Sequence, residues 1–167
     1  MVVRVSKSRQ LQIRISAEDK ALIGARAESA GMDVSKWVLH QVLAPVEREF
    51  QALCRELASR PEARRFTFAE LQDRFHRLTG SEFVRAVRYA PEARLPAFEA
   101  NYLAAMVEQA AAIKGVRPPR WTIDVEALDW PWFASSLKSL RLYLLTHSPP
   151  PFRRRNLFID SSVGQRV

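Results

Sequence analysis

The sequence has little cysteine and little glycine among its 167 residues. Cys54 is its one cysteine, so an internal disulfide is excluded and a reducing compartment is favoured. We therefore expect a cytoplasmic protein. Its five glycines form no glycine-rich phosphate loop, and there is no G-x-S-x-G motif of a nucleophilic serine. These scarcities disfavour disulfide scaffolds and nucleotide-binding enzymes.

Metal-ligand patterns and long apolar runs are absent as well. His40, His76 and His147 lie far apart, and none pairs with a histidine or cysteine at the spacing of metal ligands. No apolar run approaches the roughly 20 residues that cross a bilayer. The sequence therefore predicts a soluble protein that binds no metal or cofactor and is not an enzyme.

Positive charge is abundant. The net charge is +8, which favours an acidic partner, and the apolar fraction of 47% is enough for a hydrophobic core. The first sixteen residues contain no acidic residue, and their cations are Arg4, Lys7, Arg9 and Arg14. We interpret this segment as a basic arm that binds nucleic acid.

Residues 10–16 alternate polar and apolar side chains with period two, which is typical of a strand. The apolar positions are Leu11, Ile13 and Ile15, and the polar positions are Gln10, Gln12 and Arg14. So short a strand needs a partner strand and helices beneath it. We expect two copies to pair antiparallel, with the apolar side chains on the helices and the polar side chains free to enter a major groove.

Two helices are expected after this strand. Ser16 and Asp19 form an S-x-x-D capping pattern, so a helix begins near Ala17, and Gly31 suits its C-terminal end. A second helix opens at Asp33 and continues until Pro45, which removes a backbone donor.

This order of strand, capped helix, glycine and capped helix resembles the ribbon-helix-helix DNA-binding superfamily, and its bacterial antitoxins in particular, over residues 7–45. The resemblance implies that Gln10, Gln12 and Arg14 read bases. It implies phosphate contacts by Lys7, Arg9, Ser35 and Lys36, together with free backbone amides after Asp33. The dimer core would contain Leu11, Ile13, Ile15, Trp37 and Val38.

The rest of the chain predicts further helices. We expect a linker helix over 46–60, and in 61–167 helices over 67–78, 81–89, 96–114 and 135–146, then a strand-like 157–160. A capping box at Thr67–Glu70 would open the first of these. The leucines of 135–146 suit a partner-binding helix and core packing equally well.

The last part of the chain, residues 95–167, resembles the C-terminal regions of regulators found beside nucleotidyltransferase-like toxins. The resemblance implies binding of a toxin or a ligand. The candidate partner-binding residues are Trp130, Trp132, Phe133, Arg153, Arg154 and Arg155. Core packing of the aromatic residues and a solvated arginine loop remain the alternatives.

The expected fold is mainly α. It consists of a ribbon-helix-helix domain over 1–45, with one short strand and two helices in an obligate dimer, and a compact helical module with a short terminal strand. The expected function is a repressor of transcription that is the antitoxin of a toxin–antitoxin pair, bound to operator DNA and to its toxin. The alternatives are a dimeric adaptor that does not bind DNA, and a plain regulator with a sensing domain.

Overall fold

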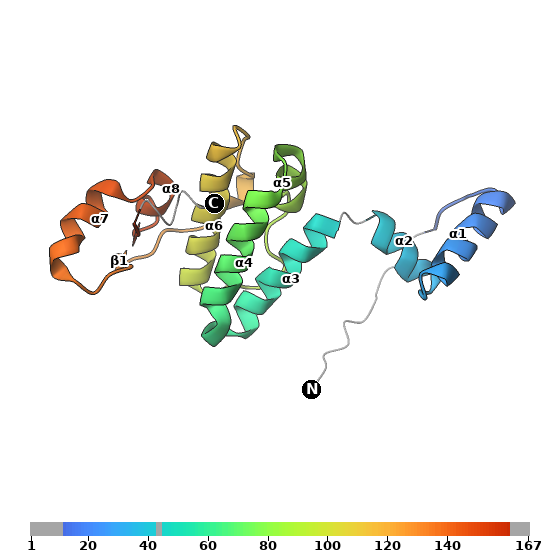
Figure 1. The fold of residues 1–167 in the computed structure, drawn as a ribbon, viewed down its shortest axis with the longest axis horizontal. Coiled ribbons are helices and arrows are strands. Elements are labelled where there is room, and N and C mark those ends of the chain that lie inside the picture. Colours follow the sequence, from blue (N-terminus) through green and yellow to red (C-terminus); the bar gives the residue numbers. More distant parts are fainter. Residues whose placement is uncertain (1–11, 43–44, 161–167) are drawn as a thin grey trace. The chain divides into compact units, whose positions relative to one another are not determined.

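The computed structural model describes residues 12–42 and 45–160, and the chain divides into two compact units. Unit 1 is residues 1–42 and unit 2 is residues 43–167. Helices dominate both units, as expected, and the described residues contain eight α-helices and a two-stranded sheet (Figure 1).

Unit 1 contains α1 (Ala17–Ser29) and α2 (Val34–Val42). The Ser16 side chain accepts a 3.0 Å hydrogen bond from the Asp19 amide, which confirms the predicted start of α1. Gly31 has φ 64°, its amide donates to the Glu28 carbonyl at 2.9 Å, and the Met32 amide donates to the Ala27 carbonyl at 3.0 Å. This pair of bonds is a Schellman motif, so α1 ends where the glycine predicts.

The predicted strand precedes α1. Residues 12–16 belong to no strand in the single chain, and positions 10 and 11 lie outside the described residues. The hydrogen bonds of the expected ribbon would come from a second copy of the chain. The pairing of two strands therefore stays a prediction.

The core of unit 2 is formed by α3 (Pro45–Ser59), α4 (Arg64–Arg77), α5 (Gly80–Ala86) and α6 (Ala97–Ile113), with a 3₁₀ turn over Pro61–Ala63. The rings of Phe50, Phe75 and Phe83 join α3, α4 and α5, with centroids 6.2 and 5.2 Å apart. Helix α6 is the most extensively buried of the four. Gly115, directly after the predicted end at 114, terminates it with a second Schellman motif.

Two expectations about this core are corrected. Residues 46–60 are not a separate linker, because Phe50, Cys54 and Leu57 of α3 are fully buried in unit 2. The predicted capping box at position 67 is absent: α4 begins three residues earlier, and the Thr67 hydroxyl donates to the Ala63 carbonyl at 3.3 Å. The capping box lies instead at Thr79, which caps α5.

Short elements complete unit 2. They are a 3₁₀ turn over Arg120–Thr122, β1 (Trp132–Phe133), a 3₁₀ turn over Lys138–Leu140, α7 (Arg141–His147), α8 (Pro150–Arg153) and β2 (Leu157–Phe158). The two strands pair in parallel, with Trp132 opposite Leu157. The predicted terminal strand is thus confirmed, whereas the helix expected over 135–146 is α-helical only from Arg141.

Candidate nucleic-acid interface and partner surfaces

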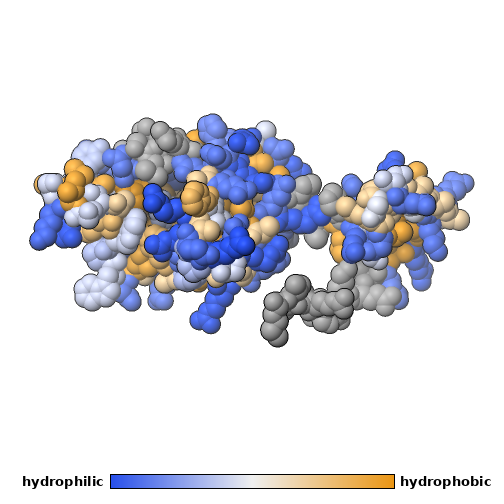
Figure 2. All heavy atoms as spheres, turned by 60° about the horizontal axis from the view of Figure 1, so that its bottom comes forward, coloured by the Kyte–Doolittle hydropathy of each residue, from blue (hydrophilic) through white to orange (hydrophobic). Residues whose placement is uncertain are grey.

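Unit 1 leaves many large apolar side chains exposed in the single chain. Ile13 and Ile15 retain 59% and 48% of their accessible surface. Among the described residues of unit 1, the fully buried apolar residue is Ala27. The other exposed apolar side chains are Leu22, Met32, Val34, Leu39 and Val42. Figure 2 shows apolar atoms among the polar ones on this unit. Two short helices cannot cover these side chains by themselves, so a further surface is needed to bury them.

The polar positions of the predicted ribbon are accessible where the structure describes them. Gln12 and Arg14 are exposed and alternate with Ile13 and Ile15 directly before the cap of α1. Gln10, with the expected phosphate contacts Lys7 and Arg9, lies outside the described residues. Trp37 and Val38, expected in the dimer core, are half-buried in the single chain.

The start of α2 differs from the expected phosphate site. The Asp33 carboxylate accepts a 2.8 Å hydrogen bond from the Lys36 amide, and its second oxygen lies 3.3 Å from the Lys36 ammonium. Asp33 therefore caps α2, and the Lys36 amide is not free. The aspartate was visible in the sequence as a helix cap. A phosphate at this position would depend on the exposed side chains of Ser35 and Lys36 and would meet the negative charge of Asp33.

The three consecutive arginines 153–155 of unit 2 differ in burial. Arg155 is buried, lies 2.7 Å from Glu108, and donates to the carbonyls of Thr122 and Val125 at 2.5 and 3.1 Å. Arg154 lies 2.5 Å from the same carboxylate but is mostly exposed. Arg155 is therefore a structural residue that holds the segment before β2 against α6. The prediction that it binds a partner is corrected. Arg153 is exposed.

The three candidate aromatic residues, at positions 130, 132 and 133, also differ in burial. Trp132 and Phe133 are half-buried in β1, where Trp132 packs on Phe98 and Phe133 stacks on Phe158, both at 4.9 Å. The core alternative therefore accounts for these two. Trp130 is 82% exposed and stays available to a partner.

The segment 135–147 is far more exposed than core packing requires. Its buried apolar residue is Leu144, and its exposed ones are Leu137, Leu140, Leu142, Tyr143 and Leu145. We call these five residues the α7 surface. The sequence left core packing and partner binding open for these leucines, and the structure excludes core packing for the exposed ones.

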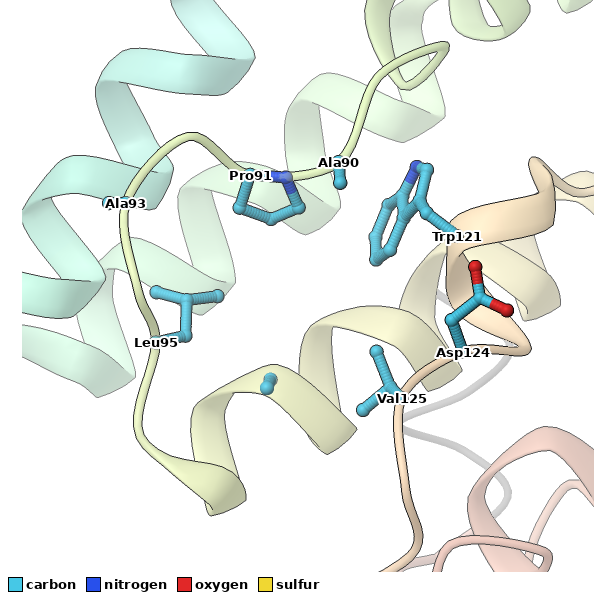
Figure 3. Close-up of a pocket in the computed structure, with 8 residues that line it drawn as sticks. Ala90, Pro91, Ala93, Leu95, Trp121, Asp124 and Val125 are labelled. Carbon is cyan, nitrogen blue, oxygen red and sulfur yellow. The ribbon is translucent and has the colours of Figure 1, made fainter.

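A small hollow lies between the 90–95 loop and the 121–125 segment (Figure 3). Its volume is about 270 Å³, and its lining is apolar apart from Asp124. Trp121 forms one wall and donates a 2.8 Å hydrogen bond to the Val87 carbonyl. With one carboxylate among apolar groups, this hollow contains no pair of acid and base.

Within residues 12–42 and 45–160, no three His, Cys, Asp or Glu side chains are grouped as metal ligands. In the same ranges, no helix has the length and apolar character needed to cross a membrane.

Comparisons with known proteins found no match to the chain among family models, curated proteins or solved structures.

Proposed function

We propose that the protein is a homodimeric ribbon-helix-helix repressor that binds operator DNA through unit 1 and a partner protein through unit 2. The observation that carries the proposal is the exposure of Ile13 and Ile15, which alternate with Gln12 and Arg14 immediately before a capped helix. Antiparallel pairing with a second copy would bury the isoleucines and leave the polar side chains together on the opposite face.

The chemistry of the polar face suits base recognition. A glutamine side chain offers a donor and an acceptor to the adenine edge, and an arginine can donate two hydrogen bonds to guanine. Dimer symmetry doubles each contact. The basic residues of the first sixteen positions add affinity for phosphates that does not depend on base sequence.

The antitoxin role concerns unit 2. We propose that this unit binds the product of a neighbouring gene and neutralises it, while unit 1 represses the shared promoter. Exposed Trp130 and the α7 surface support a partner-binding unit, because large apolar side chains without cover mark interaction sites.

The experiment is a gel-shift titration of the purified full chain against DNA from upstream of its gene and against scrambled DNA of the same length. We expect the upstream DNA to bind at least about a thousandfold more tightly at physiological salt. Light scattering on the same sample should give twice the chain mass. Equal binding of both DNAs by a dimer would favour the adaptor alternative, and a strict monomer at micromolar concentration would overturn the proposal.

The antitoxin role has a separate test. Expression of the adjacent reading frame alone should arrest growth, and co-expression of this protein should relieve the arrest. If the neighbouring product is harmless, or its toxicity is not relieved, the antitoxin role is lost while the repressor role remains.

A further inference from the structure

The α7 surface is held to unit 2 by very little packing. Figure 1 shows α7 at the far end of unit 2 from α3, and the helix contacts the preceding 3₁₀ turn and β2. Leu144 is its one buried residue, and the Ser148 hydroxyl lies 2.6 Å from the Leu144 carbonyl and 2.7 Å from that of Ile159. A seven-residue helix has little stability without tertiary packing, so a further surface would stabilise it.

Apolar side chains surround α7 on the sides that face away from unit 2. At about 100° per residue, Leu142 lies about 200° from Leu144, on the opposite side of the helix, whereas Tyr143 and Leu145 lie on its flanks. Leu142 retains 73% of its accessible surface. The polar side chains of α7, which are Arg141, Thr146 and His147, lie between the apolar ones and do not gather on one side. Covering Leu142 together with its apolar neighbours on both flanks therefore requires an occupant with a cleft rather than a flat face.

The chain between Asp129 and Asp160, which contains the α7 surface, carries charge of one sign. Residues 130–159 contain no aspartate or glutamate, and their cations are Lys138, Arg141, Arg153, Arg154 and Arg155. Glu108 of α6 neutralises Arg155 and contacts Arg154. Among the described residues, Lys138, Arg141 and Arg153 form no ion pair; Arg141 lies over the Phe133 ring at 5.2 Å and Arg153 donates to the Thr146 carbonyl. These three cations therefore border the apolar side chains without an ion pair inside the described part of the chain.

This combination excludes several occupants. A symmetric contact with the same face of a second copy would bring the same cations against these, and residues 1–11 and 161–167 of the chain are also basic, with no acidic residue. DNA offers phosphates but no apolar cleft for Leu142 and its neighbours. A membrane surface requires a helix with one polar side, which α7 lacks.

We propose that α7 binds in an apolar cleft of a partner protein, and that carboxylates on the rim of the cleft pair with Lys138, Arg141 and Arg153. This proposal rests on the partner-binding role proposed for unit 2 and adds its location and the chemistry of its partner. It is independent of DNA binding by unit 1.

The test begins with a photo-crosslinking phenylalanine analogue placed at position 142 of the full chain in the native host. The same analogue at position 66 of α4 is the matched control, because Phe66 is 80% exposed but lies away from α7 in the sequence. We expect one protein to crosslink at 142 and not at 66, and mass spectrometry would identify it. Crosslinking to a second copy, to lipid alone, or equally at both positions would overturn the proposal.

The identified protein is then purified and titrated against variants by calorimetry. Leu142→Asp should raise its Kd at least about tenfold, whereas Phe66→Asp should change it less than about twofold. Arg141→Glu should also raise the Kd and should reduce its dependence on salt. Wild-type affinity of L142D, or a salt dependence unaltered by R141E, would contradict the proposal.

The same variants separate this proposal from the repressor role. L142D should still bind upstream DNA with wild-type affinity, because the substitution lies in unit 2. Loss of partner binding by L142D with DNA binding retained supports the proposal that α7 binds in a cleft. Absence of specific DNA binding in the wild type would contradict the repressor role alone, because the calorimetric titration tests the α7 proposal separately.

Discussion

The paired arginines 154 and 155 show how burial decides the role of a residue. Both guanidinium groups contact Glu108, at 2.5 and 2.7 Å, but the side chain of Arg154 is 67% exposed and that of Arg155 is 8% exposed. An ion pair in water contributes little to stability, whereas removal of one partner of a buried pair leaves the other charge without compensation.

Arg155→Leu should therefore lower the free energy of unfolding by about 3 kcal/mol, and Arg154→Leu by less than about 1 kcal/mol. Urea denaturation followed by circular dichroism would measure both. Equal losses in the two variants would contradict the structural role of Arg155.

Cys54 gives unit 2 a pH dependence at high pH. Burial raises the pKa of its thiol from 9.0 to about 12, with nearby Glu92 adding to the rise and Arg55 opposing it. The neutral thiol thus stabilises the fold fully below about pH 9, and this stabilisation is lost as the pH rises towards 12, because the unfolded chain ionises first.

The stability advantage of the wild type over Cys54→Ala should accordingly shrink between pH 8 and pH 11. Denaturation midpoints of the two proteins at each pH would measure it. A thiol reagent at pH 8 should label the unfolded chain rapidly and the native chain slowly; fast native labelling would show that Cys54 is accessible.

Arg14 is the residue on which sequence-specific binding depends most in the proposed ribbon. Arg14→Ala should reduce the preference for the operator over scrambled DNA by about 1–3 kcal/mol and leave the dimer intact. Arg26→Ala, in α1, removes the same charge from an exposed position of unit 1 and should preserve that preference. Gel shifts would compare them, and unchanged discrimination by R14A would exclude Arg14 from base reading.

At the scale of the element, the glycines of unit 1 have opposite roles. Gly24 lies within α1, and a methyl group there would meet no atom within 4 Å. Gly31 also has room, but its φ of 64° is one that side chains rarely adopt. The conformation of each position, and not the space around it, therefore decides the effect of substitution.

Gly24→Ala should raise stability by about 0.5–1 kcal/mol, because alanine favours the helix interior. Gly31→Ala should lower stability by about 1 kcal/mol, because it strains the Schellman turn. Thermal unfolding of the full chain would measure both shifts. If G31A were as stable as G24A, the left-handed turn would not limit the end of α1.

For the whole molecule, the two units should respond differently to dilution. If unit 1 folds as part of a dimer, its stability depends on protein concentration, whereas unit 2 has a core of its own around Phe50, Phe75 and Phe83. Scanning calorimetry over a hundredfold range of concentration should move one transition and leave the other fixed. Ile15→Asp should abolish the first transition without affecting the second, and a concentration-independent first transition would contradict the dimer.

Local chemistry made parts of the fold and of the candidate site predictable. The caps at Ser16, Gly31 and Gly115 involve residues within five positions of one another, so the ends of α1 and α6 could be predicted. Gln12 and Arg14 are exposed, but Ile13 and Ile15 are exposed as well, so the predicted strand stays a prediction. Asp33 was also recognisable as a helix cap, although the amides after it were expected to be free.

The sequence by itself determined that the chain is mainly helical, with a short basic segment and two capped helices at its start, because helix periodicity and caps depend on close neighbours. Only the tertiary structure decided which apolar and charged residues are covered. It placed α3 in the core of unit 2, paired Trp132 with Leu157, buried Arg155 against Glu108, and left Leu142 exposed while Leu144 is covered. Burial depends on contacts between residues far apart in the chain, and the local sequence around one residue does not show which distant residues will cover it.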